Sequence, residues 1–236
     1  MEADQIKIGG RWILLRNQFL GGGAFGKVYK GQDTKTGDQV AIKEINLKII
    51  QAKNEDFTLS NAIRELNNMM QCSQSNNSHL VKLLGFKLDD DHENIYMVTE
   101  LCDGTLGDLK KQKGSFSEKE ALEYGRQIAE GLIVIHDDLG MTHRDLKFDN
   151  ILHKAGVLKI TDFGISKFED PKSSTNGIIN IVNCAPETIM YDVKGFSVDV
   201  WALGLIIHEL IFSRHPFHAE GKDINSIPGS VEYQPY

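Results

Sequence analysis

One run of polar residues near the middle of the chain constrains its fold more than any other feature. It reads His143-Arg144-Asp145-Leu146-Lys147-Phe148-Asp149-Asn150, and Asp162-Phe163-Gly164 begins twelve positions after it. This short span holds a carboxylate that can accept an alcohol proton, a cation, and two side chains whose oxygens suit Mg²⁺. Such groups act together only when the fold gathers them in one cleft, and in combination they are typical of phosphoryl transfer to a hydroxyl.

Composition places the chain among ordinary globular proteins. Its 236 residues are 41% hydrophobic and 25% charged, so a packed core is expected in one large domain or two small ones. A net charge of −7 argues against nucleic acid as the main partner. The three cysteines share no metal or redox spacing, no apolar run is long enough for membrane insertion, and no signal peptide is evident. A cytoplasmic, intracellular location is expected.

The hydrophobic pattern divides the chain into a strand-rich first part and a helical second part. An amphipathic helix is expected from about Leu59 to Met70, with Ile63, Leu66 and Met70 at helical spacing. A polar loop over Gln74–Ser78 and a linker over Cys102–Thr105 follow from their composition. The expected strands are Ile13–Leu20, Lys27–Gly31, Gln39–Ile45, Leu80–Leu88 and Ile95–Glu100.

Helical patterns begin at Ser117. Ser117 and Glu120 form a capping-box pattern, in which each side chain can bond to the backbone N–H of the other residue. A second apolar helix is expected over Val198–Phe212, after a loop-rich middle. The side chains expected to point inward from the first helix are Ala121, Leu122, Tyr124, Ile128, Leu132 and Ile135.

Two motifs near the N-terminus suit a nucleotide. The run Leu20-Gly21-Gly22-Gly23-Ala24-Phe25-Gly26-Lys27-Val28 contains G-x-G-x-x-G-x-V between two expected strands. Glycines let backbone N–H groups approach phosphate oxygens without a Cβ in the way. A strand after the motif, in place of a helix, disfavours a dinucleotide fingerprint. Val40-Ala41-Ile42-Lys43 then places a lysine on a strand, seventeen positions after Gly26.

Together these motifs resemble the eukaryotic protein kinases of serine/threonine type, from about Leu20 to Phe217. The resemblance implies a bilobal α+β fold in one kinase domain. Residues 1–102 would form an N-lobe with an antiparallel sheet and one helix, and residues 103–236 a mainly helical C-lobe. It also implies that Mg-ATP donates its γ-phosphoryl group to a serine or threonine hydroxyl of a protein substrate. The oligomeric state is not indicated.

The resemblance assigns roles to the catalytic residues. Asp145 would orient the hydroxyl and accept its proton, while Lys147 would neutralise charge on the transferring phosphate. Asn150 and Asp162 would hold Mg²⁺. Lys43 would contact the α- and β-phosphates, held by a glutamate of the amphipathic helix. Glu65 is favoured as that glutamate because Met69, one turn on, can pack inward, and Glu55 is the alternative.

Further positions follow from the same resemblance. Thr99 would be the gatekeeper, with Glu100, Leu101 and Cys102 as the hinge beside adenine. Arg144 would pair with a phosphorylated residue of the activation segment, and Asp199 would brace the catalytic loop. The adenine would lie between Val28, Ala41 and Leu152, and the candidate phosphate acceptors are Ser173, Ser174 and Thr175.

The sequence departs from the family pattern at two places. Asn180 stands where a threonine is usual, and the last C-lobe helices are missing after Phe217. In the family, the missing part normally carries an arginine that pairs with the glutamate matched by Glu187. Loss of one partner of such an ion pair costs ~3–5 kcal/mol, so the C-lobe should be loose unless another cation substitutes. These departures keep open an ATP-binding, pseudokinase-like scaffold with little turnover. A small-molecule or lipid kinase is a weaker alternative.

Overall fold

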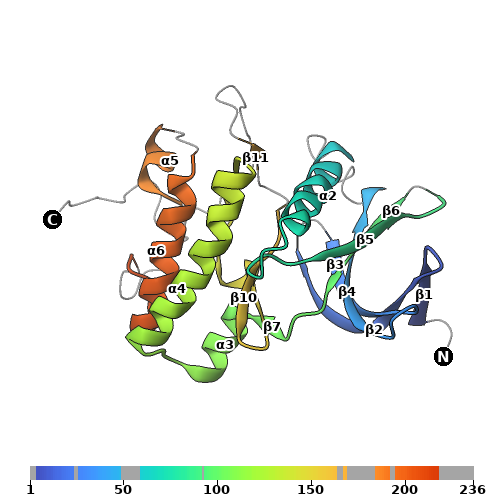
Figure 1. Cartoon of the computed structure of the whole chain (residues 1–236), viewed down its shortest axis with the longest axis horizontal. Helices are drawn as coiled ribbons and strands as arrows, with labels where there is room; N and C mark the ends of the chain where they lie inside the picture. The colour runs from blue at the N-terminus through green and yellow to red at the C-terminus, as the bar shows by residue number, and fades with distance from the viewer. Residues whose placement is uncertain are drawn as a thin grey trace.

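A curled antiparallel sheet with one helix beside it forms the first lobe, and helices form the second, in a computed structural model of the chain (Figure 1). The structure describes residues 4–23, 26–48, 59–91, 93–163, 167–168, 184–191 and 195–217. The expected bilobal α+β architecture is confirmed. The expected boundary between Cys102 and Asp103 stays a prediction, and it falls between the last N-lobe strand and the first C-lobe element.

The N-lobe sheet has six strands in the order β1-β2-β3-β4-β6-β5, all antiparallel to their neighbours. Helix α2 (Leu59–Gln74) lies beside it. Strand β1 has no counterpart in the sequence expectations, because four residues before a Gly9-Gly10 turn give too short a pattern. The strands are β1 (Gln5–Ile8), β2 (Trp12–Gly23), β3 (Gly26–Asp33), β4 (Gln39–Asn46), β5 (Leu83–Leu88) and β6 (Asn94–Glu100).

The strand register gives the sheet two different faces. Val28 pairs with Lys43, and Lys43 pairs with Met97, so these three side chains share one face. The opposite face carries a separate buried cluster, which comprises Ile8, Trp12, Leu14, Tyr29, Val40, Ile42, Tyr96 and Val98. A Cβ added at Gly85 would lie 2.4 Å from the Trp12 ring, so the indole packs directly on that backbone.

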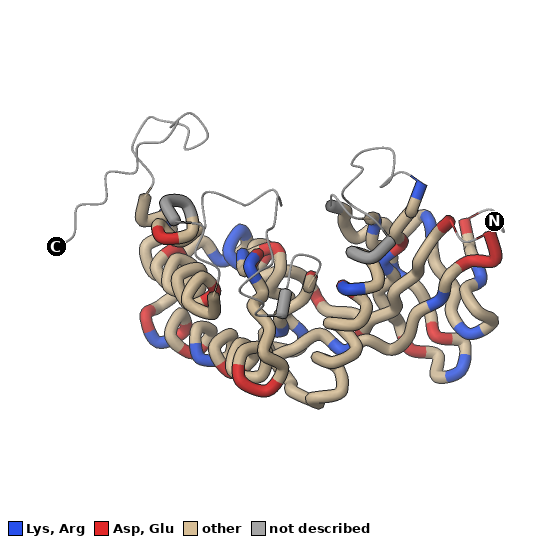
Figure 2. The backbone as a smooth tube through the Cα atoms, turned by 90° about the horizontal axis from the view of Figure 1, so that it is seen from above, with Lys and Arg blue, Asp and Glu red and all other residues tan. Residues whose placement is uncertain are grey.

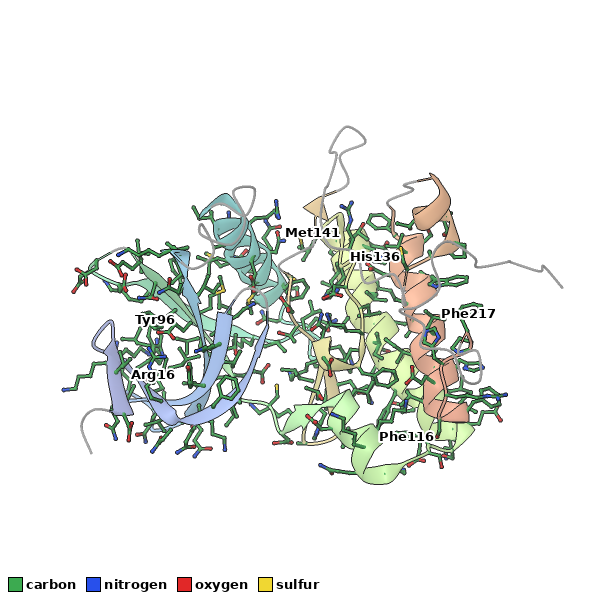
Figure 3. The ribbon with its side chains drawn as sticks, turned by 180° about the vertical axis from the view of Figure 1, so that it is seen from behind. Arg16, Tyr96, Phe116, His136, Met141 and Phe217 are labelled. Carbon is green, nitrogen blue, oxygen red and sulfur yellow. The ribbon has the colours of Figure 1, made fainter. Side chains whose placement is uncertain are left out.

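A partly buried polar network borders this cluster. The Arg16 guanidinium forms two hydrogen bonds to Glu44, at 2.5 and 2.6 Å, and the Tyr96 hydroxyl donates to the same carboxylate at 3.3 Å. Figure 3 labels Arg16 and Tyr96 on the sheet. Burial is the main reason that the pKa of Tyr96 is raised, to about 12.

The second lobe combines helices with short strand pairs. The stretch expected to be a loop-rich middle contains the β9–β10 hairpin, with β7 added to its edge, and a β8–β11 pair. These strands are too short to give a clear alternating pattern. The elements are β7 (Gly104–Thr105), α3 (Leu106–Lys113), α4 (Glu118–Ile133), the π-helical turn η2 (Val134–Asp138), β8 (Met141–Thr142), the 3₁₀ turn η3 (Phe148–Asn150), β9 (Ile151–Lys154), β10 (Val157–Ile160), β11 (Lys167–Phe168), α5 (Pro186–Tyr191) and α6 (Ser197–Phe212).

Helix starts follow the local chemistry of the sequence. The expected capping box opens α4, where Glu120 N–H donates to the Ser117 hydroxyl and Ser117 N–H donates to the Glu120 carboxylate. Helix α3 starts in the same way at Thr105 and Asp108, a signal that the sequence reading missed. Both boxes satisfy N–H groups that a helix start otherwise leaves unpaired.

Three expectations about buried faces and bounds are wrong. On α2, Ile63 is 45% exposed and Met70 is 36% exposed. The face that packs inward contains Ala62, Leu66, Met69 and Cys72, together with polar Glu65 and Asn68, so the helix is rotated relative to the expectation. On α4, Leu122 is 52% exposed, although the other expected core residues are buried or half-buried. The strand expected from Leu80 begins only at Leu83.

One continuous apolar core connects the lobes. It runs from Met97 and Leu80 in the first lobe, past Phe163, to Ile128 and Ile206 in the second. Leu80 also bridges to Ile160 in parallel, which joins the segment before β5 to the C-lobe hairpin. Among the described helices, none has both the length and the hydropathy of a membrane span.

Candidate active site

Three charged residues meet where β4, α2 and the segment after β10 come together. Lys43 Nζ lies 2.5 Å from Glu65 Oε1 and 3.5 Å from Asp162 Oδ1. Glu65 is 2% exposed. Burial alone would lower the pKa of Lys43, but the two carboxylates outweigh it and the pKa is raised. The lysine therefore stays charged. The alternative partner, Glu55, lies outside the described residues.

The catalytic-loop candidates form a second cluster around one carboxylate. Lys147 Nζ lies 2.6 Å from Asp145 Oδ2. The Asn150 amide nitrogen donates to the same oxygen at 2.9 Å and to the Asp145 backbone oxygen at 2.8 Å. Because the amide nitrogen faces Asp145, the Asn150 carbonyl oxygen is the atom of that side chain suited to a cation.

A buried carboxylate from α6 holds the backbone of this loop. Asp199 accepts hydrogen bonds from the N–H of His143 at 2.7 Å and from the N–H of Arg144 at 2.8 Å. His136 Nε2 lies 2.8 Å from the same carboxylate, and its ring stacks on Phe196. His136 is labelled near the centre of the C-lobe in Figure 3, and sequence reasoning did not identify it. Arg144 has a φ of 69° in this arrangement.

The candidate nucleotide residues gather on one face of the N-lobe sheet. Ala41 pairs with Thr99 across β4 and β6, and Val28 pairs with Lys43 across β3 and β4. These four side chains are half-buried. In the expected hinge, Glu100, Leu101 and Cys102 are half-buried too, and Leu152 on β9 pairs with Thr105.

The glycine-rich motif forms the end of the β2–β3 hairpin. Gly21 pairs with Val28, Gly23 pairs with Gly26, and the turn residues Ala24 and Phe25 lie outside the described residues. A Cβ at Gly21 would meet nothing within 4 Å, and Leu20 and Gly22 are exposed. A Cβ at Gly26 would lie 2.4 Å from the Glu44 backbone oxygen, so packing between strands also requires a glycine there.

The Glu100 side chain has a structural role that the sequence did not reveal. Its carboxylate contacts Lys159 Nζ at 2.9 Å, Lys154 Nζ at 3.1 Å and the Lys82 backbone N–H at 3.1 Å. Burial would raise the pKa of Glu100, but these hydrogen bonds outweigh it and the pKa is lowered. The end of β6 is thereby tied to the β9–β10 hairpin of the other lobe.

The candidate regulatory arginine has a cationic neighbour. Arg64 of α2 has a lowered pKa, mainly because it is partly buried and also because Arg144 is close. Within the described part of the chain, the buried Arg64 Nε has no hydrogen-bond acceptor. The candidate phosphate acceptors Ser173, Ser174 and Thr175, and the unusual Asn180, lie outside the described residues.

Glu187, whose usual partner was expected to be missing, lies on α5 at the edge of an apolar hollow of about 530 Å³. It forms no ion pair with any described residue. The hollow is lined by Glu187, Ser197, Val200, Trp201, Gly204 and Leu205. Along the described backbone, acidic and basic residues are interspersed in both lobes (Figure 2). Among the residues that the structure describes, no group of three or more His, Cys, Asp or Glu side chains is arranged to hold a metal ion.

Comparison with known proteins agrees with this geometry. The model of the family described as "Protein kinase domain" matches residues 14–231. The chain is 31% identical over 220 residues to a mitogen-activated protein kinase kinase kinase of Pyricularia oryzae, covering 89% of this chain and 14% of that protein. It is 34% identical over 207 residues to calcium/calmodulin-dependent protein kinase type 1 of Caenorhabditis briggsae, covering 85% of this chain and 55% of that protein. The chain thus spans 14% of the length of the first relative and 55% of the second. It belongs to the protein kinase domain family.

Proposed function

We propose that this chain is a serine/threonine protein kinase that transfers the γ-phosphoryl group of Mg-ATP to a protein hydroxyl. The observation that carries the proposal is the chain of contacts from Glu65 through Lys43 to Asp162, next to the cluster of Asp145, Lys147 and Asn150. Together these side chains supply cations that can bind phosphate, and carboxylates that can bind a metal ion or accept a proton. The names of the relatives agree with a protein kinase, since both are named as protein kinases.

In the proposed reaction, the substrate hydroxyl oxygen attacks the γ-phosphorus while the bond to the β-phosphate oxygen breaks. Asp145 orients the hydroxyl and receives its proton, and ADP leaves with the electron pair of the broken bond. Lys147 would offset negative charge on the transferring group, and its contact with the Asp145 carboxylate supports this role. Lys43, held by Glu65, contacts the α- and β-phosphates.

The oxygen atoms of Asn150 and Asp162 fit a magnesium ion. Both are hard donors, and the hydrogen bonds of Asn150 use its nitrogen, which leaves its oxygen for a cation. A magnesium ion held by these two side chains would offset the negative charge of the phosphates. A pair of protein ligands is compatible with Mg²⁺, because this ion dehydrates reluctantly and usually keeps several waters.

The nucleotide would lie against the face of the sheet that carries Val28, Ala41 and Thr99, with Leu152 on its other side. Backbone groups of Glu100 and Cys102 would bond to the adenine edge. The residues of the glycine-rich motif, from Leu20 to Gly26, would cover the phosphates, and the open space beside Gly21 supports this placement.

For regulation, we propose that Arg144 receives a phosphate on Ser173, Ser174 or Thr175, and that Arg64 shares it. Two guanidinium groups held close together repel each other, and a phosphate dianion removes that repulsion. Such an anion would connect α2 to the catalytic loop. The activation segment would then favour the arrangement in which Lys43 and Glu65 are paired.

The test is phosphotransfer from Mg-ATP to a generic protein substrate, with incorporated phosphate located by mass spectrometry. Asp145→Asn should lower kcat by about 10²-fold or more. Asp149→Asn is the matched control, because this exposed carboxylate belongs to the same loop. It should keep turnover near the wild-type value. Equal turnover in wild type and Asp145→Asn, with both chains folded, would contradict the proposal.

The scaffold alternative predicts a different outcome. An ATP-binding protein without turnover would gain thermal stability with Mg-ATP but would incorporate no phosphate into itself or a substrate. The comparisons lend no support to this alternative, since the relatives are named as kinases. The geometry also retains both the ion pair of Lys43 and the cluster around Asp145.

A further inference from the structure

Helix α2 buries a second polar side chain one turn after Glu65. Asn68 is 0% exposed, and its Nδ2 donates a 3.3 Å hydrogen bond to the backbone oxygen of Phe163. Phe163 is itself fully buried and contacts the His143 ring edge to face. The bond therefore joins the N-lobe helix directly to the segment that carries Asp162.

An asparagine is an unfavourable choice at this position unless the hydrogen bond matters. Its helix propensity is lower than that of leucine, and burying a carboxamide costs free energy that a hydrogen bond only partly returns. The buried residues on the same side of the helix are Glu65 and Cys72. A leucine at position 68 would avoid the cost of burying a carboxamide, so the polar group has a cost in stability.

We propose that Asn68 is a positioning residue. It would stabilise one arrangement of α2 and Phe163, in which Phe163 is buried and Glu65 of α2 pairs with Lys43. The inference rests on the proposed kinase function, because that arrangement places Asp162 near Lys43. The consequence is coupling: if Phe163 leaves its buried site, or α2 moves outward, the bond from Asn68 is broken.

Two contacts from one helix face support this coupling. Glu65 reaches Asp162 through Lys43, while Asn68 reaches the next residue of the motif, Phe163, without an intermediary. Positions three apart lie on the same side of a helix. Both contacts are therefore broken together if α2 moves outward, and also if the segment Asp162–Phe163 moves.

The test compares Asn68→Leu with Asn67→Leu in the whole 236-residue chain. Asn67 is exposed, so both variants gain the same helix propensity but only one loses the hydrogen bond. Both should unfold at the same or higher urea concentration than wild type. Hydrogen exchange of the peptide that contains Phe163 should become about fivefold faster in Asn68→Leu alone, the factor expected for one net hydrogen bond.

Turnover supplies the second readout. In Asn68→Leu, kcat should fall by up to about fivefold while stability does not fall, a combination that a purely structural role would not give. Unchanged exchange, or unchanged kcat in an active enzyme, would overturn the inference. If wild type shows no turnover, the proposed function fails, and exchange at Phe163 alone decides whether Asn68 couples the two segments.

A second variant covers the case in which Asn68→Leu does not fold. Asn68→Ala removes the amide without adding bulk, and Asn67→Ala is its control because it gains the same helix propensity at an exposed position. Exchange of the Phe163 peptide should again be about fivefold faster in Asn68→Ala alone. Equal exchange in the two alanine variants would overturn the inference.

Discussion

The carboxylate of Asp199 should be among the most sensitive single groups in the C-lobe. Substituting Asp199→Asn preserves the shape of the side chain and removes its charge and one acceptor. One oxygen of Asp199 accepts from the His143 N–H and faces His136, and the other accepts from the Arg144 N–H. An asparagine keeps most bonds when its oxygen faces His143. Its NH₂ group then faces the Arg144 N–H.

The expected loss follows from these contacts. With the new NH₂ group facing the Arg144 N–H, the charge-assisted hydrogen bond from Arg144 is lost and this buried N–H has no acceptor. We expect that change to cost about 2–3 kcal/mol. The hydrogen bonds from the His143 N–H and from His136 then have a neutral acceptor in place of a charged one. Together this weakening should cost roughly 1 kcal/mol or somewhat more. We therefore expect Asp199→Asn to lower the free energy of unfolding by about 3–5 kcal/mol, a large share of the roughly 5–15 kcal/mol of a typical domain.

The assay is equilibrium unfolding in urea, with the slope against denaturant checked for each variant. Asp138→Asn is the matched control, because this exposed residue of η2 undergoes the same chemical change and should alter stability by less than about 0.5 kcal/mol. A loss below about 1 kcal/mol in Asp199→Asn, with an unchanged slope, would refute the view that this carboxylate holds the catalytic loop.

Other sites give equally definite expectations. Gly85→Ala should lower stability by ~1–3 kcal/mol in urea unfolding, because the new Cβ would lie 2.4 Å from the Trp12 ring; no loss would contradict this packing. Burial, with a contribution from Glu100, raises the pKa of the Cys102 thiol to about 11, so alkylation at pH 8, followed by mass spectrometry, should be roughly 100-fold slower than for an ordinary thiol. Glu100→Gln should destabilise the chain most at neutral pH. Because the folded-state pKa of Glu100 is lowered, its contribution is present above the unfolded value near ~4.3 and fades as pH falls through the folded value. Urea unfolding at several pH values checks this, and a pH-independent difference would contradict it.

Helix spacing predicted the contact between Lys43 and Glu65, but it predicted the packing of the same helix only in part. Glu65 was favoured over Glu55 because Met69 could pack inward, and Met69 is buried while Glu65 pairs with Lys43. Spacing along a helix is a local property, so it is readable from the chain alone. The same helix was assigned the wrong face at Ile63, since a polar Asn68 looks like a solvent-facing residue until its partner is known.

Contacts between distant segments could not be read from the chain. The bond from Asn68 to Phe163 joins residues 95 positions apart, and the ion pairs of Glu100 join β6 to the C-lobe hairpin. Polar residues at such positions carry no periodic signal. Short strands such as β1 and β7 were missed for a related reason, because they are defined by the strand they pair with.

The left-handed backbone of Arg144 and Asp162 gives the candidate active site a cost in stability. Their φ angles are 69° and 65°, and a residue with a Cβ pays about 1–2 kcal/mol for that conformation where glycine would not. Glycine at either position would therefore relax the fold while deleting a guanidinium or a carboxylate. Selection of this chain for thermal stability alone should therefore favour glycine at these positions. The most stable variants would then be the ones that lack the charged groups of the candidate site.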